Sequence, residues 1–173
     1  MQKKNDDTHV WPKDTILITG DSILNGLEEN RMRNIGKHSV KIRPFPGADI
    51  LDMYSYITPL LRKKPTYLFL HIGCNDSLNM TSSEIHDAML NLKAHIEDVL
   101  PSCTVFLSAP VLRLDNGKAG LTLQNLGNKM KIMSNVILND NIDRSCLGGK
   151  GLHLNPKGSG RLAINYLSQI RRL

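Results

Sequence analysis

Short apolar runs alternate with longer segments of helical periodicity along this chain. The short runs are rich in β-branched and aromatic residues, a composition typical of strands, and three of the four are nearly continuous in apolar residues. Such continuity is expected when both faces of a parallel sheet are covered. The predicted strands are TILITG (15–20), SVKIRP (39–44), TYLFLHIG (66–73) and TVFLSAP (104–110), with a short fifth strand near residues 145–147.

Amphipathic segments separate the predicted strands. Apolar positions three and four apart predict a helix over residues 50–61. Thr81 and Glu84 form a capping box that opens a second helix, and Pro156 opens the last one. The predicted buried positions of the later helices are Ile85, Met89, Leu92, Ile96 and Val99; Leu123, Leu126, Met130, Met133 and Ile137; and Leu162, Tyr166, Leu167 and Ile170.

Strands that alternate with helices of this length predict right-handed βαβ crossovers. The expected fold class is α/β, a three-layer α/β/α sandwich around a parallel sheet of about five strands. The length of 173 residues suits one domain, which we place at residues 15–173 after a polar lead-in over residues 1–14. In an open parallel sheet ligands bind outside the carboxyl ends of the strands, so the loops at that edge are where a site is expected.

Composition excludes several classes of protein. Hydrophobic residues make up 40% of the chain and charged residues 22%, which is typical of a soluble globular protein. The sequence has neither a run long enough to span a membrane nor an apolar signal segment, so an intracellular, cytoplasmic setting is expected. The abrupt polar start predicts a domain of a longer, multidomain protein. The three widely spaced cysteines fit neither a disulfide framework nor a zinc site.

Positive charge is concentrated in the last part of the chain. The net charge is +6, and from residue 100 onward ten Lys and Arg stand against three Asp. This excess is either a solvated basic face or a surface that attracts nucleic acid or an anionic membrane. No segment matches a nucleic-acid-binding motif, and the aromatic residues are not clustered with the basic ones, so charge alone leaves the partner open.

Candidate chemistry follows the predicted strands at the expected edge of the sheet. Ser22 ends the GDS run after the first strand, Gly47 lies in PFPGADI after the second, and Asn75 lies in GCND after the third. His153 lies in GLHLNPKG, ahead of the last helix. A serine becomes a good nucleophile when an imidazole takes its proton. The backbone N–H groups of Ser22 and Gly47 and the Asn75 amide would then hold the oxyanion.

Each of these residues also has a structural alternative. Ser22 would cap a helix, and Gly47 would supply the left-handed position of a type II turn. Asn75 would begin an Asx turn, and His153 would be structural. These alternatives are independent and would have to coincide, in order, at four strand ends. Their combination therefore favours one shared catalytic site.

The same four segments resemble blocks I, II, III and V of the SGNH (GDSL-type) hydrolases: GDS, the isolated Gly47, GCND, and LH before NPKG. The resemblance follows the family's order and spans Gly20 to His153. It implies a flavodoxin-like sheet with strand order 2-1-3-4-5 and hydrolysis of an ester or related acyl bond without a cofactor. On the matching positions Ser22 is the nucleophile, His153 is the base, and Ser22 N–H, Gly47 N–H and Asn75 form the oxyanion hole.

The segments ILITGDSIL, FPGADI, LHIGCND and GLHLNPKG also resemble the esterase domain in the first open-reading-frame protein of some LINE-type retrotransposons. That resemblance would account for the abrupt ends and for a basic surface beside nucleic acid or membrane. The expected substrate is a small ester or lipid, most simply one with a short acyl chain such as acetyl. Residues 109–120 are expected to shape the acyl pocket.

One position departs from the family pattern. SGNH hydrolases usually carry an acid three residues before the histidine, where this chain has Lys150. The acid normally holds the imidazole tautomer and stabilises the imidazolium. A backbone carbonyl around Lys150 would replace it, Asp140 or Asp143 would reach in, or the enzyme would be inactive. We favour the carbonyl and hence a Ser–His dyad. The alternative function is a weak or inactive SGNH-like module that binds nucleic acid or anionic lipid through its basic C-terminal surface.

Overall fold

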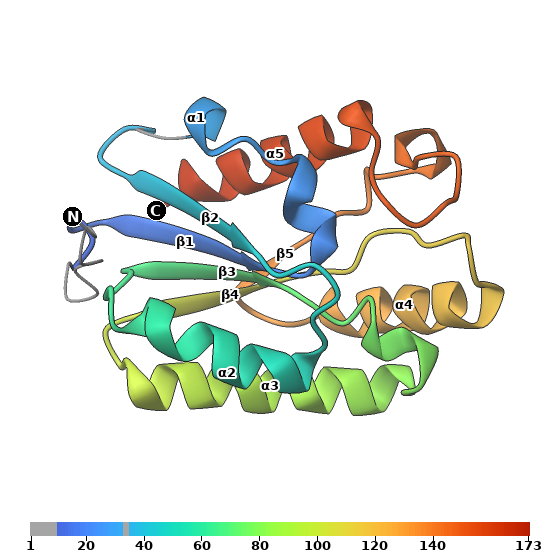
Figure 1. Ribbon diagram of the computed structural model, residues 1–173, viewed down its shortest axis with the longest axis horizontal. Coiled ribbons are helices and arrows are strands. Elements are labelled where there is room, and N and C mark those ends of the chain that lie inside the picture. Colours follow the sequence, from blue (N-terminus) through green and yellow to red (C-terminus); the bar gives the residue numbers. More distant parts are fainter. Residues whose placement is uncertain (1–9, 33–34) are drawn as a thin grey trace, which may run out of the picture.

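A computed structural model of the protein describes residues 10–32 and 35–173, so residues 1–9 of the predicted lead-in lie outside the described residues. Five strands form one parallel sheet in the order β2-β1-β3-β4-β5 (Figure 1). This confirms the α/β/α class and the implied strand order 2-1-3-4-5. The strands are β1 (Thr15–Gly20), β2 (Ser39–Pro44), β3 (Tyr67–His71), β4 (Thr104–Ser108) and β5 (Val136–Ile137).

Helices cover both faces of the sheet, with α1 and α5 on one side and α2, α3 and α4 on the other (Figure 1). Alternate residues of each strand feed the two cores, as the two-residue period of a strand requires. In β1, Leu17 packs toward α2 and α3, whereas Ile16 and Ile18 pack toward α5. The helices are η1 (Ser22–Gly26), α1 (Glu29–Met32), α2 (Ile50–Leu61), η2 (Asp76–Leu78), α3 (Ser82–Val99), α4 (Gly117–Met130), η3 (Arg144–Cys146) and α5 (Pro156–Ile170), where η denotes a 3-10 helix.

The predicted helix starts at Thr81 and Pro156 are confirmed. Thr81 Oγ1 accepts the Glu84 N–H, and Glu84 Oε2 accepts the Thr81 N–H at 2.7 Å, which completes the capping box. Asn155 caps α5 by accepting the Gly158 N–H at 3.0 Å. Of the positions predicted to be buried in α3, only Val99 is wrong, since it is the last residue of the helix and 53% exposed.

The predicted position of the fifth strand is wrong. Residues 144–146 form η3 instead, because the Asp143 side chain accepts the Ser145 N–H at 2.9 Å and folds the segment into a helical turn. The fifth strand is Val136–Ile137, which pairs with the end of β4. The sequence therefore predicts the number of strands correctly but misplaces the last one.

The helix predicted to include Ile137 is also shorter than expected. It ends at Met130, and Asn135 then adopts a left-handed φ of +55°. Ile137 is buried against the sheet from β5, so it fits the helical spacing by coincidence. An apolar residue at helical spacing predicts that the residue is buried, but it does not by itself distinguish a helix from a strand.

The register brings the carboxyl ends of the strands to one edge. Gly20 pairs with both Pro44 and His71, and Ser108 pairs with Ile137. The loops that follow these residues therefore meet at that edge, at the right of Figure 1. None of the helices formed by residues 10–32 and 35–173 combines the length and the apolarity that crossing a bilayer requires.

Candidate active site

Strand β1 ends in close contact with the end of β3. Gly20 has a φ of +149°, and a Cβ there would lie 1.7 Å from the His71 carbonyl oxygen. The same carbonyl accepts the Asp21 N–H at 3.0 Å, and the Gly20 carbonyl accepts the Phe45 N–H at 2.7 Å. A side chain at position 20 is thus sterically excluded, and these contacts fix the turn that leads into Ser22.

Asp21 caps the 3-10 helix that begins at Ser22. Its Oδ1 accepts the Ile23 N–H at 3.0 Å, so the acid takes the capping role that the structural alternative gave to the serine. Ser22 is partly exposed, and within residues 10–32 and 35–173 its hydroxyl has no hydrogen-bond partner. The hydroxyl lies at the carboxyl edge of the sheet and is available for chemistry.

Two buried carboxylates, Asp21 and Asp76, lie close enough together for the charge of one to affect the other. Asp21 is 1% exposed, and its Oδ2 has no partner among the described residues. Burial raises the pKa of Asp21 to about 7, helped by the charge of Asp76 and opposed by Arg113. Asp76 Oδ1 accepts the Ile50 N–H at 3.1 Å, and burial raises the pKa of Asp76 as well. Both acids hold backbone N–H groups at helix starts beside the candidate site.

Gly47 lies in a tight turn between β2 and α2. The Ala48 N–H donates to the Phe45 carbonyl at 3.0 Å, and Gly47 has the left-handed φ, +84°, that the third residue of a type II turn requires. A Cβ on Gly47 would meet no atom within 4 Å, and the Gly47 N–H has no acceptor in the described part of the chain. The predicted turn is therefore compatible with a backbone donor that no described group occupies.

The Asn75 side chain joins the loop after β3 to this turn. Its Nδ2 donates to the Ala48 carbonyl at 2.7 Å, and it makes no capping bond to η2. The primary amide has a second N–H, which the described residues leave without an acceptor. Asn75 and Gly47 are therefore brought together, as the predicted oxyanion hole requires.

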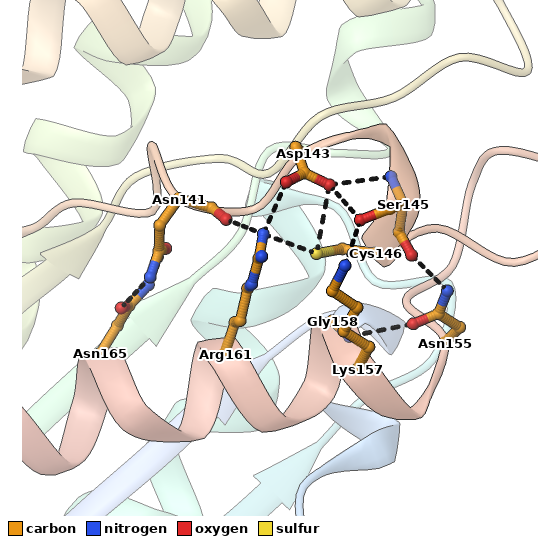
Figure 2. A network of polar contacts seen from close by, with 9 residues as sticks. All are labelled: Asn141, Asp143, Ser145, Cys146, Asn155, Lys157, Gly158, Arg161 and Asn165. Atoms are coloured by element: carbon orange, nitrogen blue, oxygen red, sulfur yellow. Dashed lines mark hydrogen bonds and ion pairs between the residues drawn. The ribbon is translucent and has the colours of Figure 1, made fainter.

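His153 lies in a closed hairpin ahead of α5. Leu147 and Leu154 form an antiparallel bridge, and the Gly148 N–H donates to the His153 carbonyl at 2.8 Å. Asn155 Nδ2 donates to the Ser145 carbonyl, and Asn155 Oδ1 accepts the Gly158 N–H (Figure 2). Asn155 Nδ2 also donates to the Leu147 carbonyl. The hairpin thus holds an exposed histidine at a fixed point of the backbone.

The His153 hairpin lies beside the helix that carries Ser22. Gly26, at the end of η1, and Leu154 line one groove of about 370 Å³, and a Cβ on Gly26 would lie 2.1 Å from Ser159 Oγ of α5. Within the described residues, the His153 ring makes no hydrogen bond to Ser22 or to any other group. Catalytic hydrogen bonds are often long before substrate binds. The pairing of Ser22 with His153 stays a prediction.

Neither aspartate considered as a replacement acid contacts His153. Asp143 lies between Arg161 and Ser145 (Figure 2), and those hydrogen bonds lower its pKa. Asp140 pairs with Lys131 at 3.3 Å. The Lys150 carbonyl accepts no hydrogen bond from the described residues, so it remains available as the neutral partner that we favoured.

The loop predicted to shape the acyl pocket lines a different cavity. Residues 110–114 and one face of α4 enclose a cavity of about 490 Å³. Ser22, Gly47, Asn75 and His153 are all absent from its lining. The loop therefore lines a cavity on the side of α4, and its role in shaping an acyl pocket stays a prediction.

Arg113 lies in this loop and was not among the predicted site residues. Its guanidinium is 5% exposed and donates to the Asp115 carboxylate and to the Cys74 carbonyl. The only sequence signal is an arginine between two leucines and two residues before an acid, in LRLD. Such a pattern is too common on protein surfaces to identify a buried arginine.

His71 belongs to the core rather than to the candidate site. It is 2% exposed, burial lowers its pKa to about 4, and its Nδ1 lies 2.9 Å from Ser108 Oγ. Tyr166 and Asn139 donate to the same hydroxyl. In the part of the chain that the structure describes, no group of three or more His, Cys, Asp or Glu side chains could hold a metal ion.

No family model and no curated protein matches this sequence. Solved structures match it over nearly its whole length. A member of the lipolytic protein G-D-S-L family from Veillonella parvula has 18% identity and a TM-score of 0.70 over 92% of this chain and 99% of its own. The chain has the fold of a GDSL-like lipase.

Two further structures share the GDSL-like fold. A GDSL-like lipase from Bacteroides thetaiotaomicron has 11% identity and a TM-score of 0.71, over 92% of this chain and 88% of its own. A catalytic mutant of an acetylxylan esterase from Geobacillus stearothermophilus has 14% identity and a TM-score of 0.68, over 93% of this chain and 95% of its own. Neither structure is described as a retrotransposon protein, so that resemblance stays a prediction.

Proposed function

We propose that the protein is a serine esterase that hydrolyses a short-chain carboxylic ester through an acyl-enzyme intermediate. Ser22 is the nucleophile and His153 the base. The Ser22 N–H, the Gly47 N–H and the Asn75 amide form the oxyanion hole. The substrate is a small ester or lipid.

One observation carries this proposal. The Asn75 amide, bonded to the Ala48 carbonyl at 2.7 Å, is tied to the Gly47 turn, and both lie at the sheet edge where Ser22 presents an unbonded hydroxyl. Acyl transfer needs N–H donors beside a free hydroxyl, and the unoccupied Gly47 N–H, the second Asn75 N–H and the unbonded Ser22 hydroxyl at one sheet edge support that assignment. The GDSL-like fold, shared with lipases and an esterase, supports the same chemistry.

The proposed reaction proceeds in two balanced steps. Ser22 Oγ attacks the ester carbonyl while His153 takes its proton, and the three N–H donors bind the resulting oxyanion. Collapse of the tetrahedral intermediate breaks the carbon–oxygen bond to the alcohol, which leaves with the proton from His153. Water then attacks the acyl-enzyme, again giving a proton to His153, and Ser22 recovers that proton as the acid departs.

Hydrolysis of p-nitrophenyl acetate tests the proposal. Ser22→Ala should reduce kcat/KM at least about 1000-fold, toward the background rate. Ser55→Ala, at an exposed position of α2, is the matched control and should retain wild-type activity. A fluorophosphonate should label Ser22, and His153→Ala should abolish that labelling. Equal activity of wild type and Ser22→Ala would refute the assignment.

A second candidate function rests on unpaired positive charge. The three aspartates after residue 100 pair with Arg113, Lys131 and Arg161. The other seven basic residues of this region form no ion pair in the described structure: Lys118, Lys129, Arg144, Lys150, Lys157, Arg171 and Arg172. Unpaired cations at the surface favour binding of nucleic acid or anionic lipid, as the LINE-type resemblance also implies.

Binding measured across a salt series tests this second function. The affinity for a single-stranded RNA oligonucleotide should fall steeply between 50 and 200 mM salt, because neutralised phosphates release counterions. Vesicles with and without phosphatidylserine give the corresponding test for lipid. Binding to neither probe at low salt would exclude this function and leave the esterase proposal intact.

A further inference from the structure

The loop between β4 and α4 contains an ion pair between the buried Arg113 and the more exposed Asp115. Arg113 Nε and Nη2 donate to the two oxygens of Asp115 at 2.7 and 2.9 Å. This bidentate geometry is the strongest form of the arginine–carboxylate pair. The pairing raises the pKa of Arg113 and lowers that of Asp115, so both stay charged. The guanidinium is thereby held in one orientation within a loop that has no regular secondary structure.

The remaining arm of the guanidinium reaches the loop that carries Asn75. Arg113 Nη1 donates to the Cys74 carbonyl at 2.8 Å, and Ser77 Oγ donates to the same oxygen at 2.7 Å. This carbonyl belongs to the peptide unit that joins Cys74 to Asn75. The two hydrogen bonds therefore fix the peptide plane from which the Asn75 side chain extends.

The neighbouring backbone reaches the hairpin that carries His153. The Leu114 N–H donates to the Gly151 carbonyl at 2.8 Å. Gly151 has a φ of +71°, and a Cβ there would lie 3.0 Å from Leu114 Cβ and 3.3 Å from the Asp115 nitrogen. A glycine is needed for this close approach. Leu114 lies between Arg113 and Asp115 in the chain. The ion pair between these two neighbours therefore also fixes the hydrogen bond from Leu114 to the hairpin.

We propose that Arg113, held by Asp115, is a positioning residue that sets the spacing between Asn75 and His153. It acts through the Cys74 carbonyl on one loop and through Leu114 on the other. The catalytic consequence rests on the proposed esterase function. Lys150 stands where related enzymes carry an orienting acid, and the clamp from residues 113–115 gives the hairpin a backbone anchor one residue further along.

Hydrogen exchange tests the positioning role without reference to activity. Arg113→Lys keeps one positive charge but loses the bidentate fork. It should raise amide exchange at least about fivefold in both residues 73–79 and residues 148–153. The matched control is Arg31→Lys, which makes the same change in an exposed pair with Glu28 and should leave both segments unchanged. Faster exchange in one segment alone, or in neither, would overturn the proposal.

A double-mutant cycle tests whether Arg113 acts through Asn75. In the wild-type background Arg113→Lys should lower kcat for p-nitrophenyl acetate about tenfold, with KM changed less than about twofold. In the Asn75→Ala background the same change should lower kcat by less than about twofold, because the donor that it positions is gone. A tenfold loss in both backgrounds would show a general structural effect and would contradict the proposal.

A second variant keeps both tests informative if Arg113→Lys does not fold. Asp115→Asn preserves the shape of the partly exposed side chain and removes the charge that orients the guanidinium. It should produce the same increase in exchange in both segments. If Ser22→Ala proves as active as wild type, the esterase proposal fails by itself, and the exchange data still decide whether Arg113 spaces the two loops.

Discussion

The Asp21 carboxylate accepts the Ile23 N–H at 3.0 Å and so caps η1 across the intervening serine. Because the acid makes the cap, the fold does not use the Ser22 hydroxyl. Asp21 therefore stabilises the helix, and Ser22 is left for a different role. This division of work between adjacent residues has a direct consequence for stability.

Ser22→Ala should leave the free energy of unfolding unchanged within about 0.5 kcal/mol, because the hydroxyl makes no hydrogen bond. Thr81→Ala is the matched comparison, since it removes a hydroxyl that does cap a helix, and it should cost about 1 kcal/mol. Urea denaturation of the two variants measures the difference. A cost at Ser22 as large as that at Thr81 would show that the serine is structural.

Asp21 should make stability depend on pH in the neutral range. Burial raises its pKa from 3.8 to about 7 in the folded state, so the proton is bound more tightly there. The resulting stabilisation is fully present below pH 3.8 and is lost as the pH rises to about 7. Between pH 5 and 8 the wild type should therefore lose about 3 kcal/mol more than Asp21→Asn, which keeps the acceptor for Ile23 but does not titrate. Parallel urea titrations that gave the same pH slope for both proteins would contradict this.

His71 should change the free energy of unfolding with pH in the opposite direction to Asp21, over an overlapping pH range. Burial lowers its pKa from 6.5 to about 4, so its stabilisation is present above pH 6.5 and is lost as the pH falls to about 4. This loss amounts to about 3 kcal/mol and largely offsets the gain from Asp21. Stability should therefore fall toward acid in Asp21→Asn and rise toward acid in His71→Gln. A His71→Gln variant with the wild-type pH profile would exclude the histidine contribution.

The two glycines at the candidate site should respond differently to substitution. Gly20→Ala places a Cβ 1.7 Å from the His71 carbonyl oxygen and should cost more than about 4 kcal/mol, or prevent folding. Gly47→Ala meets no atom and should cost only the 1–2 kcal/mol or so of a left-handed alanine. Because that strain displaces a proposed oxyanion donor, kcat should nevertheless fall about tenfold or more. Thermal unfolding and p-nitrophenyl acetate hydrolysis separate the two effects.

Lys150→Asp restores an acid three residues before His153 and tests whether a carboxylate at that position improves catalysis. If a neutral carbonyl orients His153, a carboxylate at this position should raise kcat roughly tenfold by stabilising the imidazolium. The pH–rate profile should move to higher pH, because a nearby negative charge favours the protonated ring. Lys129→Asp, the same charge change on α4, is the control and should change neither quantity. An unchanged profile in Lys150→Asp would show that the hairpin does not aim residue 150 at His153.

Local chemistry explains why much of the fold was predictable. The bounds of β1 and β2 follow from an apolar run that stops at Gly20 and from an alternating segment that stops at Pro44. Helix α3 starts at the capping box that its sequence predicts. The candidate site residues were predicted because four strand-end loops each carry one unusual polar or glycine position. The tie between Asn75 and the Gly47 turn follows from that shared edge.

The missed features depend on contacts between distant segments. Val136–Ile137 is too short to give a strand pattern, and only its pairing with β4 defines it. The buried state of Arg113 depends on Cys74, which lies 39 residues away along the chain. The lining of the larger cavity likewise depends on how the loop after β4 packs on α4. Such relationships have no periodic signal in the sequence.

The contact between Gly20 and His71 bears on how variants of this domain should be interpreted. Any side chain at position 20 collides with the neighbouring strand, so the sheet requires this glycine whatever chemistry the domain performs. Its presence in a related sequence therefore reports only that the sheet is intact. The Ser22 hydroxyl makes no hydrogen bond that the described fold needs. A serine retained at this position in related sequences would therefore indicate a functional requirement rather than a structural one.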